Sequence, residues 1–164
     1  MTLSGPTGAV VATRAVAQLT GLRNLVTFDM GGTSTDCSTV VDGMENVTTN
    51  FEIEWGLPIQ VPMIDIHTIG AGGGSIAWID KGGMLRMGPQ SAGADPGPAC
   101  YGRGGEHATV TDANVVLGRI NPDYFLGGRM KLDAEAAHRA VARIAGELGM
   151  EVDQTAYAMV QIAN

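Results

Sequence analysis

Residues that could do chemistry are concentrated in one short stretch of this sequence, FDMGGTSTDCS at residues 28–38. An apolar run ends in Asp29, two adjacent glycines follow, and three hydroxyl side chains lead to Asp36. A pair of glycines allows a bend so tight that neighbouring backbone N–H groups point to one side, where they can bind phosphate oxygens. A hairpin turn with solvated polar side chains is the simpler interpretation of the same residues.

The phosphate interpretation gives each residue of this stretch a role. Asp29 and Asp36 could bind Mg²⁺ directly or through water, or could orient an attacking water molecule. The arrangement of strand, DxGGT and strand differs from the GxxxxGK[ST] loop, which leads into a helix. The residues expected to bind phosphate through backbone N–H groups or hydroxyls are Gly31, Gly32, Thr33, Ser34 and Thr35.

A second group of candidates lies about 30 residues further along the chain, at residues 65–75. Asp65 and His67 are two apart in an expected strand, so their side chains project to one face. There they could share a metal with Asp29 or Asp36 or contact a substrate, whereas the alternative is a histidine that is hydrogen-bonded at a strand end. The glycines of GAGGGS could approach a nucleotide or form a turn; the three expected at the cofactor are Gly72, Gly73 and Gly74.

The segment at residues 88–105 is rich in glycine and proline and has almost no hydrophobic periodicity, which is typical of a long loop. Cys100 could act as a nucleophile only if a base or a cation lowered its pKa, so a structural or substrate-facing thiol is favoured. Arg103 could reach a phosphate or a carboxylate, or could be a solvated surface residue. Thr111 and Asp112 are typical of a helix cap.

The elements that would position these residues follow from hydrophobic periodicity and turn residues. Strands are expected at residues 25–30, 37–41, 44–55, 59–69, 75–79 and 84–87, the first of them buried. Helices are expected at residues 7–18, from Thr111, from Leu132 or Asp133 to about Leu148, and at residues 153–164. The chemistry-bearing stretch would therefore be the turn of a hairpin.

Composition narrows the classes of protein to which the chain could belong. Its 164 residues suit one domain, and its net charge of −7 disfavours nucleic acid or an anionic membrane as a partner. An anionic ligand would have to be held by backbone N–H groups or by a metal. No apolar run reaches the roughly 18 residues of a membrane span. The two cysteines lack the spacing of a zinc site or a disulfide framework, so a reducing cytoplasm is the expected location.

Several stretches together resemble the hydantoinase A / 5-oxoprolinase family. FDMGGTSTDCS itself is similar to the second phosphate-binding hairpin of the actin, hexokinase and Hsp70 ATPase superfamily. The narrower resemblance is carried in order by SGPTGAV at 4–10, FDMGGTSTD at 28–36, DIHTIGAGGGSIAW at 65–78 and GPQSAGADPGPACYGRGG at 88–105, and it continues with TVTDANVVLGRI at 109–120 and FLGGRM at 125–130. These stretches cover most of the chain.

The resemblance implies a fold and an activity. It implies an α/β, ribonuclease H-like (actin-like ATPase) domain, with residues 1–164 as a single-domain fragment of a longer protein. Members of the family are ATP-dependent enzymes that act on cyclic amides such as hydantoins and 5-oxoproline, and some relatives carboxylate ketones. ATP with Mg²⁺ would phosphorylate the amide oxygen before the ring is opened on a hydantoinase B-type subunit or domain. This fragment is expected to be inactive alone.

The resemblance also implies site residues. Asp29, Asp36, Asp65 and His67 would be catalytic, and Asp112 stays a candidate site residue. The same fold retained as a non-catalytic nucleotide-binding or assembly domain is the alternative from another class of protein, and a subunit of an ATP-dependent ketone carboxylase is the alternative enzyme.

Overall fold

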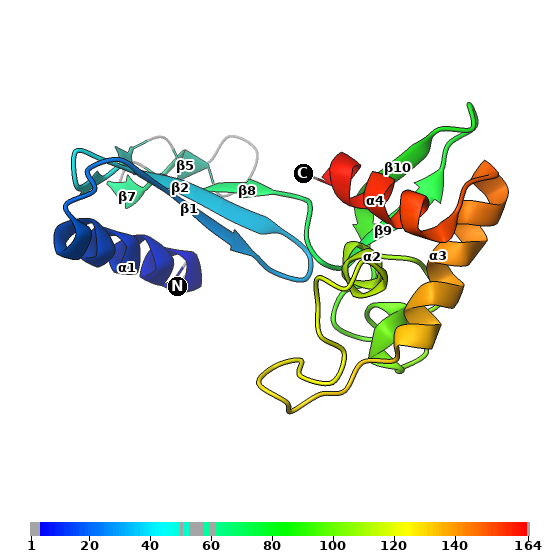
Figure 1. Ribbon diagram of the computed structural model, residues 1–164. Helices are drawn as coiled ribbons and strands as arrows, with labels where there is room; N and C mark the ends of the chain where they lie inside the picture. The colour runs from blue at the N-terminus through cyan, green and yellow to red at the C-terminus, as the bar shows by residue number, and fades with distance from the viewer. Residues whose placement is uncertain (1–3, 50, 53–57, 60–61, 164) are drawn as a thin grey trace. The chain divides into compact units, whose positions relative to one another are not determined.

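The computed structural model describes residues 4–49, 51–52, 58–59 and 62–163, which form two compact units (Figure 1). The first unit comprises Met1–Asp29 and Thr35–Ile69, and the second comprises Met30–Ser34 and Gly70–Asn164. The chain contains both helices and strands. The strand pairs β9–β10, β2–β3, β2–β8, β4–β7 and β5–β6, whose bounds are given below, are antiparallel. The α/β class expected from the sequence is therefore confirmed.

The first unit begins with helix α1, Ser4–Thr20. The predicted helix at residues 7–18 is confirmed and is a few residues longer at each end. It stops at Gly21, whose φ of 74° suits glycine and whose N–H donates to the carbonyl of Ala17 at 2.9 Å. The buried face of α1 packs Val10 and Ala17 against Val40 of the adjacent sheet, which forms the core of this unit.

The sheet of the first unit is built around β2, Thr35–Val41. Strand β1, Leu25–Met30, neighbours it in the sheet, while the short strands β3, Met44–Glu45, and β8, His67–Ile69, both pair with β2 in antiparallel orientation. Both strands predicted around the glycine turn are confirmed, with β2 beginning two residues earlier than expected. The turn between β1 and β2 is the stretch that carries the candidate chemistry.

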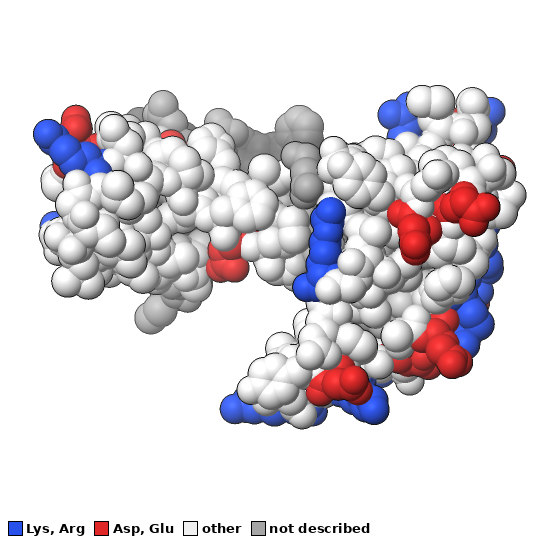
Figure 2. Space-filling model, viewed as in Figure 1, with Lys and Arg blue, Asp and Glu red and all other residues white. Residues whose placement is uncertain are grey.

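The expectation that β1 is a buried strand is wrong for the described residues. Val26 and Phe28 are 70% and 64% exposed, and only Thr27 is buried. An apolar run predicts burial on both faces, whereas only the face that bears Leu25 and Thr27 is covered here. In Figure 2, uncharged residues, polar and apolar alike, form most of the visible surface of this unit.

The two longer strands expected at 44–55 and 59–69 are divided into short pieces. Besides β3 and β8, the structure has β4, Val47–Thr48, which pairs with β7, Met63–Ile64, and β5, Phe51–Glu52, which pairs with β6, Pro58–Ile59. Alternating apolar residues do not show where a chain turns, and Pro62 has no N–H to donate within a continuous ladder. Ile53 and Trp55, expected in the first of these strands, lie outside the described residues.

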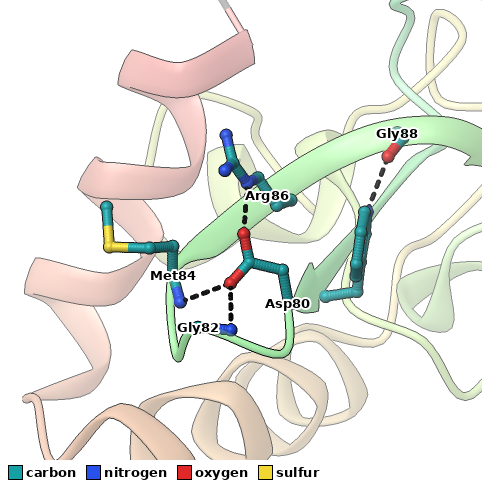
Figure 3. A network of polar contacts seen from close by, with 6 residues as sticks. Asp80, Gly82, Met84, Arg86 and Gly88 are labelled. Carbon is teal, nitrogen blue, oxygen red and sulfur yellow. Dashed lines mark hydrogen bonds and ion pairs between the residues drawn. The ribbon is translucent and has the colours of Figure 1, made fainter.

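The second unit contains a hairpin of β9, Ser75–Ile79, and β10, Leu85–Ser91, as predicted, with Ala77 opposite Met87. The side chain of Asp80 closes its turn, because one carboxylate oxygen accepts from the N–H of Gly82 at 2.9 Å and of Met84 at 3.0 Å (Figure 3). The other oxygen accepts from Nε of Arg86 at 2.7 Å. These bonds hold the pKa of Asp80 below its ordinary value, with the largest effect from the N–H of Met84 and the next from the side chain of Arg86.

The expected loop at 88–105 is partly regular, because β10 continues to Ser91 and a 3₁₀ turn, η1, follows at Ala99–Tyr101. The three helices expected after it are α2, Val110–Val116, α3, Ala134–Leu148, and α4, Val152–Ala163. They lie beside the hairpin (Figure 1). Their shared core contains Ala113, Val141 and Met159.

The caps of two helices test the sequence interpretation. Helix α3 begins next to Asp133, close to the predicted start at Leu132 or Asp133, and the Asp133 side chain caps it by accepting from the N–H of Ala136 at 2.9 Å. The expectation that Thr111 caps α2 is wrong, because Thr109 is the N-cap and Asp112 completes a capping box with it. Among the residues that the structure describes, no helix has both the length and the apolar character needed to cross a membrane.

Candidate functional site

The turn at Met30–Ser34 belongs to the second unit and is held there by its own carbonyl groups. The N–H of Gly31 donates to the carbonyl of Ser34 at 2.8 Å, which closes the turn. The carbonyls of Gly31 and Gly32 accept from the N–H groups of Gly73 and Gly74, at 2.9 and 2.6 Å. The glycine segment at 72–74 is therefore the support on which the turn rests.

Only glycine fits in this support. A Cβ atom at Gly72 would lie 2.8 Å from each of three turn atoms, the carbonyl oxygens of Gly31 and Gly32 and the nitrogen of Ser34. At Gly74 it would lie 2.8 Å from the carbonyl oxygen of Gly32. A Cβ atom cannot fit at such short distances, so the two backbone segments can approach each other only where the residue has no side chain. This is the physical requirement behind three successive glycines.

The N–H groups of the glycine segment already have protein acceptors. Gly72 donates to Oγ of Ser75 at 2.9 Å, while Gly73 and Gly74 donate to the turn. In this conformation none of the three N–H groups points to a ligand. Direct contact of these glycines with a cofactor stays a prediction, and their observed role is to position the turn.

The opposite face of the turn is open. Gly32 and Thr33 are exposed, and a Cβ atom at Gly32 would meet no atom within 4 Å. Within the described part of the chain, the N–H groups of Gly32 and Thr33 donate no hydrogen bond to the protein. Exposed, unpaired N–H groups in a tight turn form the kind of concave surface that binds phosphate oxygens. Thr35, by contrast, is buried in β2 opposite Ile69.

The two aspartates that flank the turn in sequence belong to the first unit. Asp29 is exposed near the end of β1. Asp36 is half-buried in β2, opposite Thr68 of β8, whose hydroxyl donates to Oδ1 of Asp36 at 2.6 Å. This bond holds the Asp36 carboxylate in one orientation through Oδ1.

Asp65 and His67 lie together, as predicted. Oδ1 of Asp65 is 3.5 Å from Nε2 of His67. The backbone of Asp65 is fixed on both sides, because its N–H donates to the carbonyl of Asn46 at 2.9 Å and its carbonyl accepts from the hydroxyl of Ser38 at 2.7 Å. Both side chains line a pocket of about 240 Å³ in the first unit, to which Cys37 also contributes. The pair can bind a polar ligand or transfer a proton.

A metal site formed by protein ligands alone is not present in the described ranges 4–49, 51–52, 58–59 and 62–163. No group of three or more His, Cys, Asp or Glu side chains is gathered there as such a site needs. Mg²⁺ is commonly held by one or two carboxylates together with substrate phosphates and water. Asp29 and Asp36, which flank the turn in sequence, supply carboxylate oxygens of the kind that such a set uses.

Asp112 was expected to be part of a helix cap or a site residue, and its structural role is larger than that of a cap. Its side chain is fully buried. Its carboxylate accepts from the N–H of Ala99 and Cys100 at 3.2 and 2.8 Å, and from both the N–H and the hydroxyl of Thr109 at 2.9 and 2.7 Å. It therefore fastens η1 to the start of α2. The TxxD spacing of a capping box at 109–112 was the signal in the sequence.

Helix α2 also supports the glycine segment. Thr111 donates to the carbonyl of Gly73 through both its N–H, at 2.8 Å, and its hydroxyl, at 2.9 Å. A Cβ atom at Gly73 would lie 2.7 Å from that hydroxyl oxygen. The turn thus rests on Gly73, and Gly73 rests on the first turn of α2. Arg103 lies elsewhere, with its guanidinium carbon 6.0 Å from the centre of the Tyr101 ring.

Cys100 is a structural thiol. It is fully buried, and burial followed by the negative charge of Asp112 raises the pKa of the thiol above its ordinary value. The thiolate needed for nucleophilic attack is therefore disfavoured. Cys37 is half-buried and lines a pocket.

Alkylation is expected to separate the two cysteines. Iodoacetamide at pH 8 should alkylate Cys37 at least about tenfold faster than Cys100 in the folded protein. In urea, which unfolds the chain and exposes both thiols, the two rates should become similar. Mass spectrometry of the two cysteine-containing peptides measures this. Equal rates for both cysteines in the folded protein would contradict the structural assignment of Cys100.

Comparison with known proteins gives a consistent family and fold. The sequence profile of the family described as hydantoinase/oxoprolinase matches residues 1–164. The alpha subunit of a caprolactamase from Pseudomonas jessenii is 46% identical over 162 residues, which cover 98% of this chain and 23% of that protein. A 5-oxoprolinase from Dictyostelium discoideum is 39% identical over 191 residues, covering 99% of this chain and 15% of that protein.

Solved structures agree with these matches. The nucleotide-free structure of an acetone carboxylase, described as ATP-dependent, has a TM-score of 0.84 and 33% identity, and the match covers 97% of this chain and 22% of that one. The ATP-dependent caprolactamase from Pseudomonas jessenii has a TM-score of 0.83 and 44% identity, covering 98% and 23%. The chain thus spans about a quarter or less of the proteins it matches.

Proposed function

The chain belongs to the hydantoinase/oxoprolinase family, and from this premise we propose that residues 28–36 bind the phosphate groups of ATP in an enzyme that activates a cyclic amide. One observation carries the proposal. The turn at Met30–Ser34 is held through the carbonyl groups of Gly31 and Gly32, while Gly32 and Thr33 are exposed and, among the described residues, their N–H groups have no protein acceptor. Such a surface favours an anion locally, although the net charge of the chain is −7.

Each residue of the site has a task in this proposal. The N–H groups of Gly32 and Thr33, with the hydroxyls of Thr33 and Ser34, donate to phosphate oxygens, whereas the buried Thr35 supports the turn from β2. The carboxylates of Asp29 and Asp36 hold Mg²⁺ and thereby neutralise phosphate charge. When ATP is bound, its terminal phosphoryl group supplies the activation that an unreactive amide oxygen needs before ring opening. Asp65 and His67 contact the substrate or transfer a proton.

We also propose a domain type and a partner for the chain. The chain is part of a ribonuclease H-like, actin-like ATPase domain in a longer protein, and ring opening takes place on a hydantoinase B-type subunit or domain. The subunit names of relatives, such as the caprolactamase alpha subunit, support a partner of this kind.

A ketone carboxylase is the second candidate, because the gamma subunit of an acetophenone carboxylase from Aromatoleum aromaticum is 43% identical over 93% of this chain. The phosphate turn would have the same task there. A non-catalytic nucleotide sensor would bind ATP without coupling its cleavage to a lactam. ATP cleavage measured with a lactam, with a ketone plus bicarbonate, and with neither compound separates the three candidates.

Substitution of the flanking aspartates tests the proposal. The variants Asp29→Asn and Asp36→Asn are made in the full natural protein. Each is expected to lower the rate of substrate-dependent ATP cleavage roughly 100-fold or more, because a bound metal ion stabilises the charge of the transition state by several kcal/mol. Steady-state ADP release measures this.

Asp42→Asn is the matched control. Asp42 is an exposed carboxylate of the same unit, paired with Arg23 at 3.0 Å, and its φ of 54° is tolerated by asparagine. We expect near-normal cleavage from this variant. Full activity in both Asp29→Asn and Asp36→Asn would remove the assigned metal-binding roles.

A further inference from the structure

A hollow with charged walls in the second unit lies beside the turn at Met30–Ser34, and none of the roles proposed above involves it. It has a volume of about 440 Å³, within the range of small-molecule sites. Its polar walls are Ser91, Asp95, Glu106 and His107, and Ile76 and Pro96 contribute apolar surface. Bare backbone at three glycines completes the lining.

This pocket is joined to the turn through Ser91. Oγ of Ser91 donates to the carbonyl of Gly32, at 3.5 Å, and accepts from the N–H of Gly93 at 3.1 Å. The next residue, Ala92, donates its N–H to the carbonyl of Gly74 at 2.8 Å. A wall of the pocket and the support of the turn are therefore continuous, so a ligand in the pocket lies next to the turn.

Two observations bear on the shape of the ligand. The glycine backbones bring the two ends of the loop together, because a Cβ atom at Gly105 would overlap the carbonyl oxygen of Gly97. Residues 97 and 105 of the loop therefore lie in backbone contact at the pocket. The apolar surface of Ile76 and Pro96 suits the methylene groups of a small ring.

The charge of the pocket is negative. Asp95 and Glu106 are carboxylates, His107 is the one basic side chain among the described residues that line it, and no lysine or arginine is among them. The guanidinium of Arg143 donates to the backbone carbonyl of Glu106 and does not line the cavity. Carboxylates accept hydrogen bonds from N–H groups and repel anions.

We propose that this pocket holds the amide substrate and selects a neutral cyclic amide over one that bears a carboxylate. The inference rests on the proposed function, since it names the substrate class for the same ATP site. Asp95 and Glu106 accept from the ring N–H, the ring methylenes lie against Ile76 and Pro96, and Ser91 joins the pocket to the turn. Discrimination arises from repulsion of the extra charge.

A matched pair of ligands tests the inference, because 5-oxoproline is 2-pyrrolidone with one added carboxylate. In the protein as it occurs in its source, calorimetry is expected to show tighter binding of 2-pyrrolidone. Asp95→Asn and Glu106→Gln should each move the ratio of the two affinities toward 5-oxoproline by roughly tenfold, the effect of removing one like charge a few ångströms away. Both side chains are exposed, so both variants are expected to fold.

Glu147→Gln is the control, since Glu147 is an exposed carboxylate of the same unit that does not line the pocket. Its affinity ratio should equal that of the native protein. Tighter native binding of 5-oxoproline, binding of neither compound, or an unchanged ratio in both pocket variants would overturn the inference. These outcomes differ from failure of the ATP site, which shows itself as full ATP cleavage in Asp29→Asn and Asp36→Asn.

Discussion

Gly72→Ala is expected to abolish nucleotide-dependent activity, with a loss of at least about 100-fold, although Gly72 itself donates its N–H to Ser75 and not to a ligand. The new methyl group would lie 2.8 Å from the carbonyl oxygens of Gly31 and Gly32 and from the nitrogen of Ser34. All three are backbone atoms, so no side chain can rotate away. The turn must move as a whole, and a displacement near 1 Å is sufficient to misplace bound phosphate.

The same substitution should lower the free energy of unfolding by about 1–3 kcal/mol, the usual cost of forcing an extra methyl group into packed structure. Thermal unfolding and the affinity for an ATP analogue with Mg²⁺ measure the two effects separately.

Gly70→Ala is the matched control. Gly70 lies two residues earlier, and a Cβ atom there would meet nothing within 4 Å. This variant should keep its activity and its stability. If Gly72→Ala binds the analogue as tightly as Gly70→Ala does, the turn is not the phosphate site.

The contrast between these two glycines shows how far the sequence could be interpreted. The GAGGGS stretch indicated close backbone approach, and the structure confirms such an approach at Gly72, Gly73 and Gly74. The partner in that approach could not be predicted. Spacing along the chain does not say whether a bare backbone faces a ligand or another turn, and here the partner is a turn about 40 residues earlier in the sequence.

Local elements were predictable where the signal is local. The start of a helix near Asp133 and the two strands at 75–79 and 84–87 depend on neighbouring residues alone, and they are confirmed. The division of residues 44–69 into short strands depends on which partner each piece finds across the sheet. Hydrophobic alternation carries no information about that choice.

The exposed apolar side chains of β1 have a related cause. Val26 and Phe28 gave the run its apolar character, yet they lie on the uncovered face of the strand. Periodicity indicates that a residue suits burial, but it does not identify the element that covers it. The turn between β1 and β2, in contrast, was located correctly, because adjacent glycines mark a strand-to-strand turn whatever packs around it.

The support of the candidate site continues beyond the glycine segment. Gly73 is held by Thr111 at the first turn of α2, and α2 is fastened at its N-terminus by Asp112 and Thr109. The same Asp112 carboxylate holds Cys100 in η1. Rigidity of the phosphate turn therefore depends on a buried carboxylate that contacts neither the turn nor the glycines.

Asp112→Ala is accordingly expected to give the largest loss of stability, about 3–5 kcal/mol in urea unfolding. The variant leaves four buried donors without an acceptor, the N–H groups of Ala99, Cys100 and Thr109 and the hydroxyl of Thr109. A small domain is stable by only about 5–15 kcal/mol, so much of the protein would unfold in mild denaturant. Asp112→Asn keeps the shape of the side chain but replaces an acceptor oxygen with a donor group. Its free energy of unfolding should lie between those of Asp112→Ala and the native protein.

Asp133→Ala separates this effect from ordinary helix capping. Asp133 caps α3 through the single N–H of Ala136 at an exposed site, and loss of such a cap costs about 1 kcal/mol. Since both substitutions remove an aspartate from a helix start, the difference between them measures the buried network. Equal losses in the two variants would mean that Asp112 only caps α2. A loss for Asp112→Ala several times larger, accompanied by weaker binding of an ATP analogue, would establish that the phosphate turn depends on this carboxylate.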